Sequence, residues 1–113
     1  MVYKNKRRDS KNVLAILAGG GPAPGINGVI SAATIEAINQ GVEVLGILDG
    51  FKWISQGDKK HTLRLTIENT SRIHLTGGSI IGISRENPTK SAKKMNNVIS
   101  TLKTLEVNYL LTI

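Results

Sequence analysis

The sequence predicts an α/β fold: an open, doubly wound, mostly parallel sheet in a Rossmann-like three-layer sandwich, incomplete in this chain. Three observations support this prediction. Residues 13–18 are a continuous apolar run, typical of a strand buried on both faces. Residues 25–39 place apolar side chains at helical spacing, and residues 42–48 form a second β-favouring run. Strand, helix and strand fit in about 36 residues, the size of one βαβ unit.

The first helix is predicted from the spacing of its apolar residues and from its stop signal. Ile26, Val29, Ile30 and Ala33 stand at positions i, i+3, i+4 and i+7. Gly41 follows the periodic stretch, where glycine commonly ends a helix because it accepts a left-handed backbone conformation. We therefore expect a helix from about Gly25 to Asn39.

Residues 49–90 give weaker signals. Asp49-Gly50 is a turn pair, and residues 51–65 mix polar and apolar side chains as an excursion from the sheet or a short hairpin would. Residues 71–75 favour a short helix, and residues 80–85 an extended segment. Pro88 disfavours the helical conformation in the residue before it and so separates this part from the next.

The clearest helical pattern of the chain begins near Ser91. Its apolar residues recur every three or four positions, whereas its lysines fall on other faces; the apolar residues are Met95, Val98, Ile99, Leu102 and Leu105. Residues 107–113 are again apolar and β-favouring, so we expect a strand there. A central strand of a doubly wound sheet is normally followed by a functional loop, and the sequence stops at Ile113 before one.

Length and charge distribution indicate how the chain is organised. The chain has 113 residues, enough for one domain of the usual roughly 100–150 residues. Its formal charge of +7 is concentrated in residues 1–12, where five basic residues and one acidic residue give +4 and leave +3 elsewhere. Such a tail is able to bind nucleic acid or an anionic membrane, but we favour a disordered, solvated leader over residues 1–12 and take residues 13–113 as the N-terminal part of an α/β domain.

Several classes of function are excluded by what the sequence lacks. Aromatic side chains are scarce, so we expect no nucleic-acid partner. No cysteine is present, which excludes disulfides and thiolate metal sites. No apolar run approaches the roughly 20 residues of a membrane span, and no secretory signal is visible. We therefore expect a cytoplasmic protein without membrane contact.

The glycine-rich segment 17–27 is the first candidate site. It lies between a buried strand and a helix, where main-chain N–H groups and the positive end of a helix favour an anion such as phosphate. It matches neither the P-loop nor the dinucleotide fingerprint, because no Lys-Ser/Thr follows the glycines and Pro24 stands where a glycine is required. The alternative is a tight turn without a ligand.

The second candidate site is the segment 77–85, which ends in Arg85. A guanidinium presents a planar fork that suits phosphate oxygens, whereas the alternative is a surface arginine paired with an acid such as Glu86. His61 and His74 have no partners at metal-ligand spacing, so we assign them no chemistry and expect no metal site in this chain.

Together the two loops resemble the N-terminal region of the phosphofructokinase family. The resemblance covers residues 13–113, and three motifs carry it in order: residues 20–27, residues 48–51 and residues 77–85. It implies a 6-phosphofructokinase of glycolysis, a phosphotransferase that moves a phosphoryl group from ATP or pyrophosphate to fructose 6-phosphate to give fructose 1,6-bisphosphate. It also implies Mg²⁺ and a homo-oligomer, dimer or tetramer, of the full-length protein.

The resemblance also implies roles for particular residues. Arg85 matches a catalytic arginine that stabilises charge on the moving phosphoryl group, in line with electrostatic catalysis of such transfers. The donor-binding residues it implies are Gly20, Gly21, Phe51, Arg85 and Glu86. The metal-binding and base aspartates of the family lie beyond Ile113, so we expect residues 1–113 alone to be inactive with either donor.

Two departures from the family pattern bear on function. Pro22 stands where many ATP-using bacterial members have Asp, and Ser31 and Ile35 stand where they carry effector-binding arginines. Allosteric control by ADP or phosphoenolpyruvate is therefore not expected, and the donor stays undecided. The alternatives are a related kinase with a different acceptor and a non-catalytic nucleotide-binding module.

Overall fold

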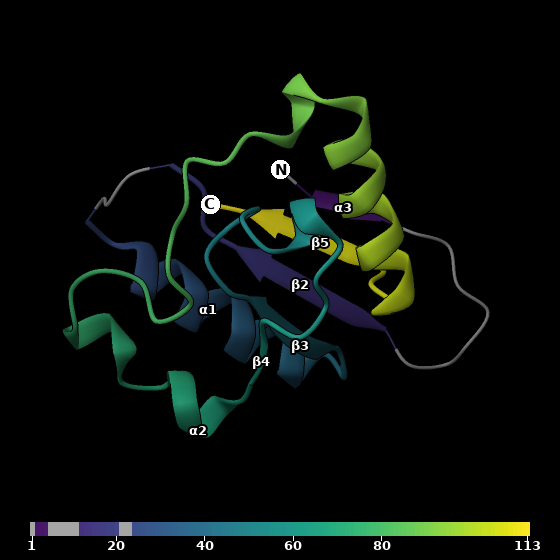
Figure 1. The fold of residues 1–113 in the computed structure, drawn as a ribbon. Helices are drawn as coiled ribbons and strands as arrows, with labels where there is room; N and C mark the ends of the chain where they lie inside the picture. Colours follow the sequence, from purple (N-terminus) through teal and green to yellow (C-terminus); the bar gives the residue numbers. More distant parts are fainter. Residues whose placement is uncertain (1, 5–11, 21–23) are drawn as a thin grey trace.

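The computed structural model describes residues 2–4, 12–20 and 24–113. One mixed sheet forms its centre, with the strands in the order β1-β5-β2-β3-β4 (Figure 1). The strands are β1 (Val2–Lys4), β2 (Val13–Leu17), β3 (Glu43–Ile47), β4 (Thr62–Leu65) and β5 (Tyr109–Thr112). The three central strands β5, β2 and β3 are parallel, and the two edge strands are antiparallel to their neighbours. The predicted mostly parallel α/β sheet is confirmed.

Helices cover both faces of the sheet. The α-helices are α1 (Ile26–Asn39), α2 (Ile67–Thr70) and α3 (Ala92–Thr104), and the 3₁₀ helices are η1 (Ile54–Gln56), η2 (Ile73–Leu75) and η3 (Pro88–Lys90). Successive side chains of a strand point to opposite faces. Ile16 therefore packs with Ile30 of α1 in one core cluster, while Leu17 packs with Val98 of α3 in the other. The three-layer arrangement is confirmed.

The two long helices begin and end close to the predicted positions. Gly25 precedes α1 with φ 86°, and Gly41 follows it with φ 81°, so glycine supplies the left-handed residue at each end. Val29 differs from the prediction, because its side chain is 46% exposed while Thr34 is fully buried. Ser91 caps α3 by accepting a hydrogen bond from the Lys94 N–H at 3.3 Å.

The region 49–90 differs most from the prediction. Residues 51–65 form no hairpin of their own: after the turn and η1, β4 returns to pair with β3, Thr62 opposite Ile47. Residues 80–85 form no strand, because Gly82 has φ 71° and closes a turn with Ser79; one isolated bridge joins Ser84 to Gly19. The predicted short helix at 71–75 is found as η2, preceded by α2.

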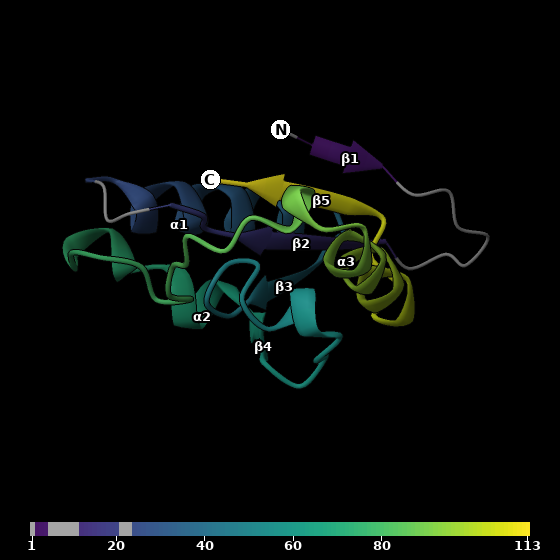
Figure 2. The same ribbon diagram turned by 45° about the horizontal axis from the view of Figure 1, so that its top comes forward.

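The N-terminal tail is ordered in part. Val2–Lys4 pairs antiparallel with β5 and lies beside it at the outer edge of the sheet (Figure 2), so these residues are not disordered as expected. The pairing covers the backbone groups of β5 that the sheet would otherwise leave exposed. Residues 1 and 5–11 lie outside the described part. None of the helices in the described residues is long and apolar enough to cross a bilayer.

Candidate phosphate-binding site

Three segments meet at the carboxyl ends of the parallel strands, where open α/β sheets bind their ligands. Gly19 and Gly20 follow β2, Asp49-Gly50 follows β3, and Ser84 approaches from the loop after η2. The Gly19 N–H donates to the Ile113 carbonyl at 3.0 Å, and the Gly20 N–H donates to the Ser84 carbonyl at 2.9 Å. Sequence-distant parts of the chain are thus joined by backbone hydrogen bonds at one corner.

The first glycine-rich loop has few free donors in its described part. The N–H groups of Gly19 and Gly20 are both used within the fold. Gly20 itself has φ 77°, is exposed, and lines the groove described below. Gly21 lies outside the described residues. The anion-attracting element that remains is the start of α1, where Gly25 provides no side-chain cap and the first N–H groups of a helix have no intrahelical partner.

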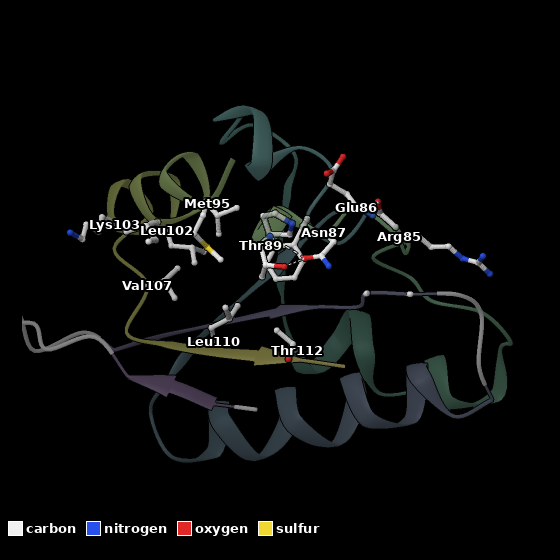
Figure 3. Close-up of a pocket in the computed structure, with 17 residues that line it drawn as sticks. Arg85, Glu86, Asn87, Thr89, Met95, Leu102, Lys103, Val107, Leu110 and Thr112 are labelled. Atoms are coloured by element: carbon white, nitrogen blue, oxygen red, sulfur yellow. Dashed lines mark hydrogen bonds between the residues drawn. The ribbon is translucent and has the colours of Figure 1, made fainter. Parts of the chain in front are cut away.

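Arg85 follows Ser84 directly and is exposed. Among the described residues its guanidinium has no ion pair, because Glu86 pairs instead with Lys94, whose Nζ lies 2.8 Å from Glu86 Oε2. Arg85 lies at one end of the groove that is described in the next paragraph, and its side chain extends away from that groove. Met95, Leu102 and Val107 lie together at the opposite end of the groove (Figure 3). The guanidinium is therefore available to an anion outside the groove's apolar part.

A groove of about 760 Å³ opens between α3, β5 and the segment 84–89. Its wall is mainly apolar, formed by Phe51, Met95, Val98, Ile99, Leu102, Val107 and Leu110. Its polar lining includes Arg85, Glu86, Asn87, Thr89, Lys103 and Thr112. The structure thus brings Gly20, Phe51, Arg85 and Glu86 to one groove, an apolar cleft with a cation at its mouth.

The turn after β3 holds this corner together. Asp49 has φ 58°, its N–H donates to the Ile81 carbonyl at 2.8 Å, and its Oδ2 accepts from Trp53 Nε1 at 2.8 Å. Trp53 stacks on His61 with ring centroids 4.0 Å apart, and His61 Nδ1 lies 3.0 Å from Asp58. The backbone N–H of Lys60 and then His61 lower the pKa of Asp58. These contacts give His61 a structural role.

Sequence reasoning assigned no role to Asn27, a residue that the structure places at the centre of this corner. It is 2% exposed at the start of α1, and its side chain bonds to the backbone of residues 76–80. An amide on the buried face of a helix, between Ile26 and Ile30, was the signal that could have identified it, because a buried polar side chain needs hydrogen-bond partners.

The acidic and histidine side chains of the described residues are dispersed. These residues contain no group of three or more His, Asp or Glu side chains that could hold a metal ion. Two carboxylates at this corner already have partners. Asp49 accepts a hydrogen bond from Trp53, and Glu86 forms an ion pair with Lys94.

Comparison with known proteins agrees with this arrangement. Residues 13–113 match the family described as phosphofructokinase. The chain is 56% identical over 100 residues to the pyrophosphate–fructose 6-phosphate 1-phosphotransferase of Thermotoga maritima, covering 88% of this chain and 24% of that protein. It is 52% identical over 105 residues to the same enzyme of Naegleria fowleri, covering 91% and 24%. The chain thus spans about a quarter of the length of these relatives.

Solved structures show the same fold. The phosphofructokinase of Pichia pastoris superposes with a TM-score of 0.77 at 24% identity, over 91% of this chain and 11% of that chain. The phosphofructokinase of Saccharomyces cerevisiae gives 0.75 at 23% identity, over 86% and 13%. The family match spans every described strand except β1 and every described helix. The chain belongs to the phosphofructokinase family.

Proposed function

We propose that the full-length protein containing this chain is a 6-phosphofructokinase that phosphorylates fructose 6-phosphate to fructose 1,6-bisphosphate, a step of glycolysis. The observation that carries the proposal is the position of Arg85, which has no ion pair among the described residues. Arg85 directly follows Ser84, whose carbonyl accepts a hydrogen bond from the Gly20 N–H. A cation held beside the carboxyl ends of parallel strands suits a phosphoryl donor.

We propose pyrophosphate as the donor and keep ATP as the alternative. Two relatives at 56% and 52% identity are named for pyrophosphate, whereas three relatives named for ATP are 29–40% identical, a range that also includes three pyrophosphate enzymes at 32–34%. The apolar groove beside Phe51 is the feature that would suit the base of ATP. Donor preference therefore has to be measured.

In the proposed reaction the 1-hydroxyl oxygen of fructose 6-phosphate bonds to phosphorus while the bond to the leaving phosphate breaks. Negative charge grows on the leaving oxygen, and the fixed positive charge of Arg85 lowers the energy of that state more than it lowers the energy of the bound substrate. The hydroxyl proton must pass to a base, and we assign that role to no described residue. Glu86 lines the groove and pairs with Lys94.

The test uses the full-length protein, fructose 6-phosphate, and either pyrophosphate or ATP. Arg85→Ala is expected to lower kcat by about 10²–10³-fold, the usual effect of removing a charge-stabilising donor. Arg64→Ala is the matched control, because Arg64 is also exposed, lies on the edge strand β4 and does not line the groove. Equal activity of the two variants, or wild-type turnover only with another acceptor, would refute the proposal.

Three further expectations are part of the same proposal: a homo-oligomer, a cytoplasmic location, and Mg²⁺ held by residues that this sequence does not include. Light scattering of the full-length protein tests the oligomer, and chelator titration of its activity tests the metal.

A further inference from the structure

We infer that Asn27 is a positioning residue that holds the segment 76–85, and with it Arg85, in register with the start of α1. The inference rests on the proposed function only for what Arg85 does; the positioning itself follows from the hydrogen bonds. Neither a glycine nor a charged group, Asn27 closes the first glycine-rich motif and reaches the second.

The side chain of Asn27 uses both ends of its amide on one short stretch of backbone. Its Oδ1 accepts from the Ile80 N–H at 2.9 Å, while its Nδ2 donates to the Thr76 carbonyl at 3.0 Å and lies 3.4 Å from the Gly77 carbonyl. With the residue only 2% exposed, water cannot readily replace these partners. A side chain of α1 thus fixes a loop about fifty residues further along the chain.

Apolar packing does little to hold the beginning of this segment. Residues 74–78 are all exposed, and Leu75 is 79% exposed, so the apolar packing of the stretch begins with the half-buried Ile80 and the buried Ile81. The backbone of residues 76–85 accepts and donates few hydrogen bonds with side chains from elsewhere. Among the described residues, Asn27 is the one residue outside this segment whose side chain bonds to that backbone. Removing the amide therefore removes the side-chain hydrogen bonds between α1 and residues 76–80 and leaves the packing of Ile80 against the core.

Between Ile80 and Arg85 the chain forms one tight turn and two backbone hydrogen bonds to other segments. Ser79 and Gly82 bond to each other in both directions, at 3.1 Å from the Gly82 N–H and 3.0 Å from the Ser79 hydroxyl. The next contacts are backbone bonds, from Asp49 to Ile81 and from Gly20 to Ser84. Asn27 at one end, and Asp49 and Gly20 at the other, thus hold the short stretch 80–84 that leads to Arg85.

The experiment is a double-mutant cycle in the full-length protein with the variants Asn27→Asp, Arg85→Ala and both. Asn27→Asp keeps the size and the acceptor for the Ile80 N–H but turns an oxygen toward the Thr76 carbonyl. We expect kcat to fall about tenfold, and the same substitution in the Arg85→Ala background to cost less than about threefold, the coupling seen between interacting residues. Asn39→Asp, at the exposed last residue of α1, is the control and should leave kcat unchanged.

Equal losses of kcat in the two backgrounds would overturn the inference. Hydrogen exchange of the amides of residues 76–85 gives a readout independent of activity: exchange should be faster in Asn27→Asp than in Asn39→Asp, and no difference would also overturn it. If Asn27→Asp does not fold, Asn27→Ser replaces it in both measurements. A wild-type protein without phosphotransferase activity would refute the proposed function, while the exchange comparison would still decide the role of Asn27.

Discussion

Replacing Gly50 by alanine is expected to destabilise the junction between the first glycine-rich loop and the Arg85 segment. Gly50 has φ +59°, and a left-handed conformation costs an L side chain about 1–2 kcal/mol. The added Cβ would lie 2.8 Å from the Ala18 carbonyl oxygen and 3.2 Å from the Ser84 nitrogen. Ala18 is fully buried and cannot withdraw, so overpacking adds about 1–3 kcal/mol. The whole loss is about 2–5 kcal/mol.

Gly57→Ala separates the two contributions. Gly57 has φ +79°, but the nearest atoms to its added Cβ are 3.9 Å away on Asn97, so only the backbone cost of about 1–2 kcal/mol applies. Native-state hydrogen exchange in the full-length protein, followed over peptides from 13–20 and 79–86, measures the local free energy of opening. If Gly50→Ala and Gly57→Ala lower it equally in those peptides, the steric reasoning is wrong.

Three other predictions concern stability. Ile16→Ala should lower the free energy of unfolding by about 2–5 kcal/mol in a denaturant titration, because Ile16 is fully buried between the sheet and α1. Ser91→Ala should cost about 1 kcal/mol through the lost cap of α3, while Ser100→Ala, exposed on the same helix, should change stability by less than about 0.5 kcal/mol. The Asp58 pKa lies below its usual 3.8, so its stabilising contribution is present above that pH and is lost as the pH falls through the lower folded value. Asp58→Asn should flatten that part of the acid dependence of the unfolding midpoint, measured from neutral pH down to about pH 2.

Local patterns were enough to place the central elements of the fold. The apolar run before Gly19, the 3.6-residue spacing from Ile26 and the stop at Gly41 correspond to β2, α1 and the turn into β3. Burial against a common core produces these periodicities, so a single sequence carries them. The same holds for α3, whose start near Ser91 and apolar face with the buried Val98 follow from the spacing of the residues.

The local patterns did not predict which strands pair with one another. Thr62–Leu65, expected to belong to an excursion or a short hairpin, pairs with β3, and Val2–Lys4, expected to be disordered, pairs with β5 across most of the chain. Alternation shows which face of a strand is buried but does not identify its neighbour. Pairing depends on backbone groups that every residue carries.

The sequence by itself determined the family resemblance, the order of the central elements β2, α1, β3, α3 and β5, and the residues that could meet a phosphate. Only the tertiary structure decided which of them are free to do so: the Gly20 N–H is used by Ser84, Glu86 is paired with Lys94, and Arg85 is left without a partner among the described residues. It also revealed Asn27 as the link between two loops. The physical reason is that hydrogen-bond and charge partners are set by distance in space, and the fold brings together groups that are tens of residues apart in the chain.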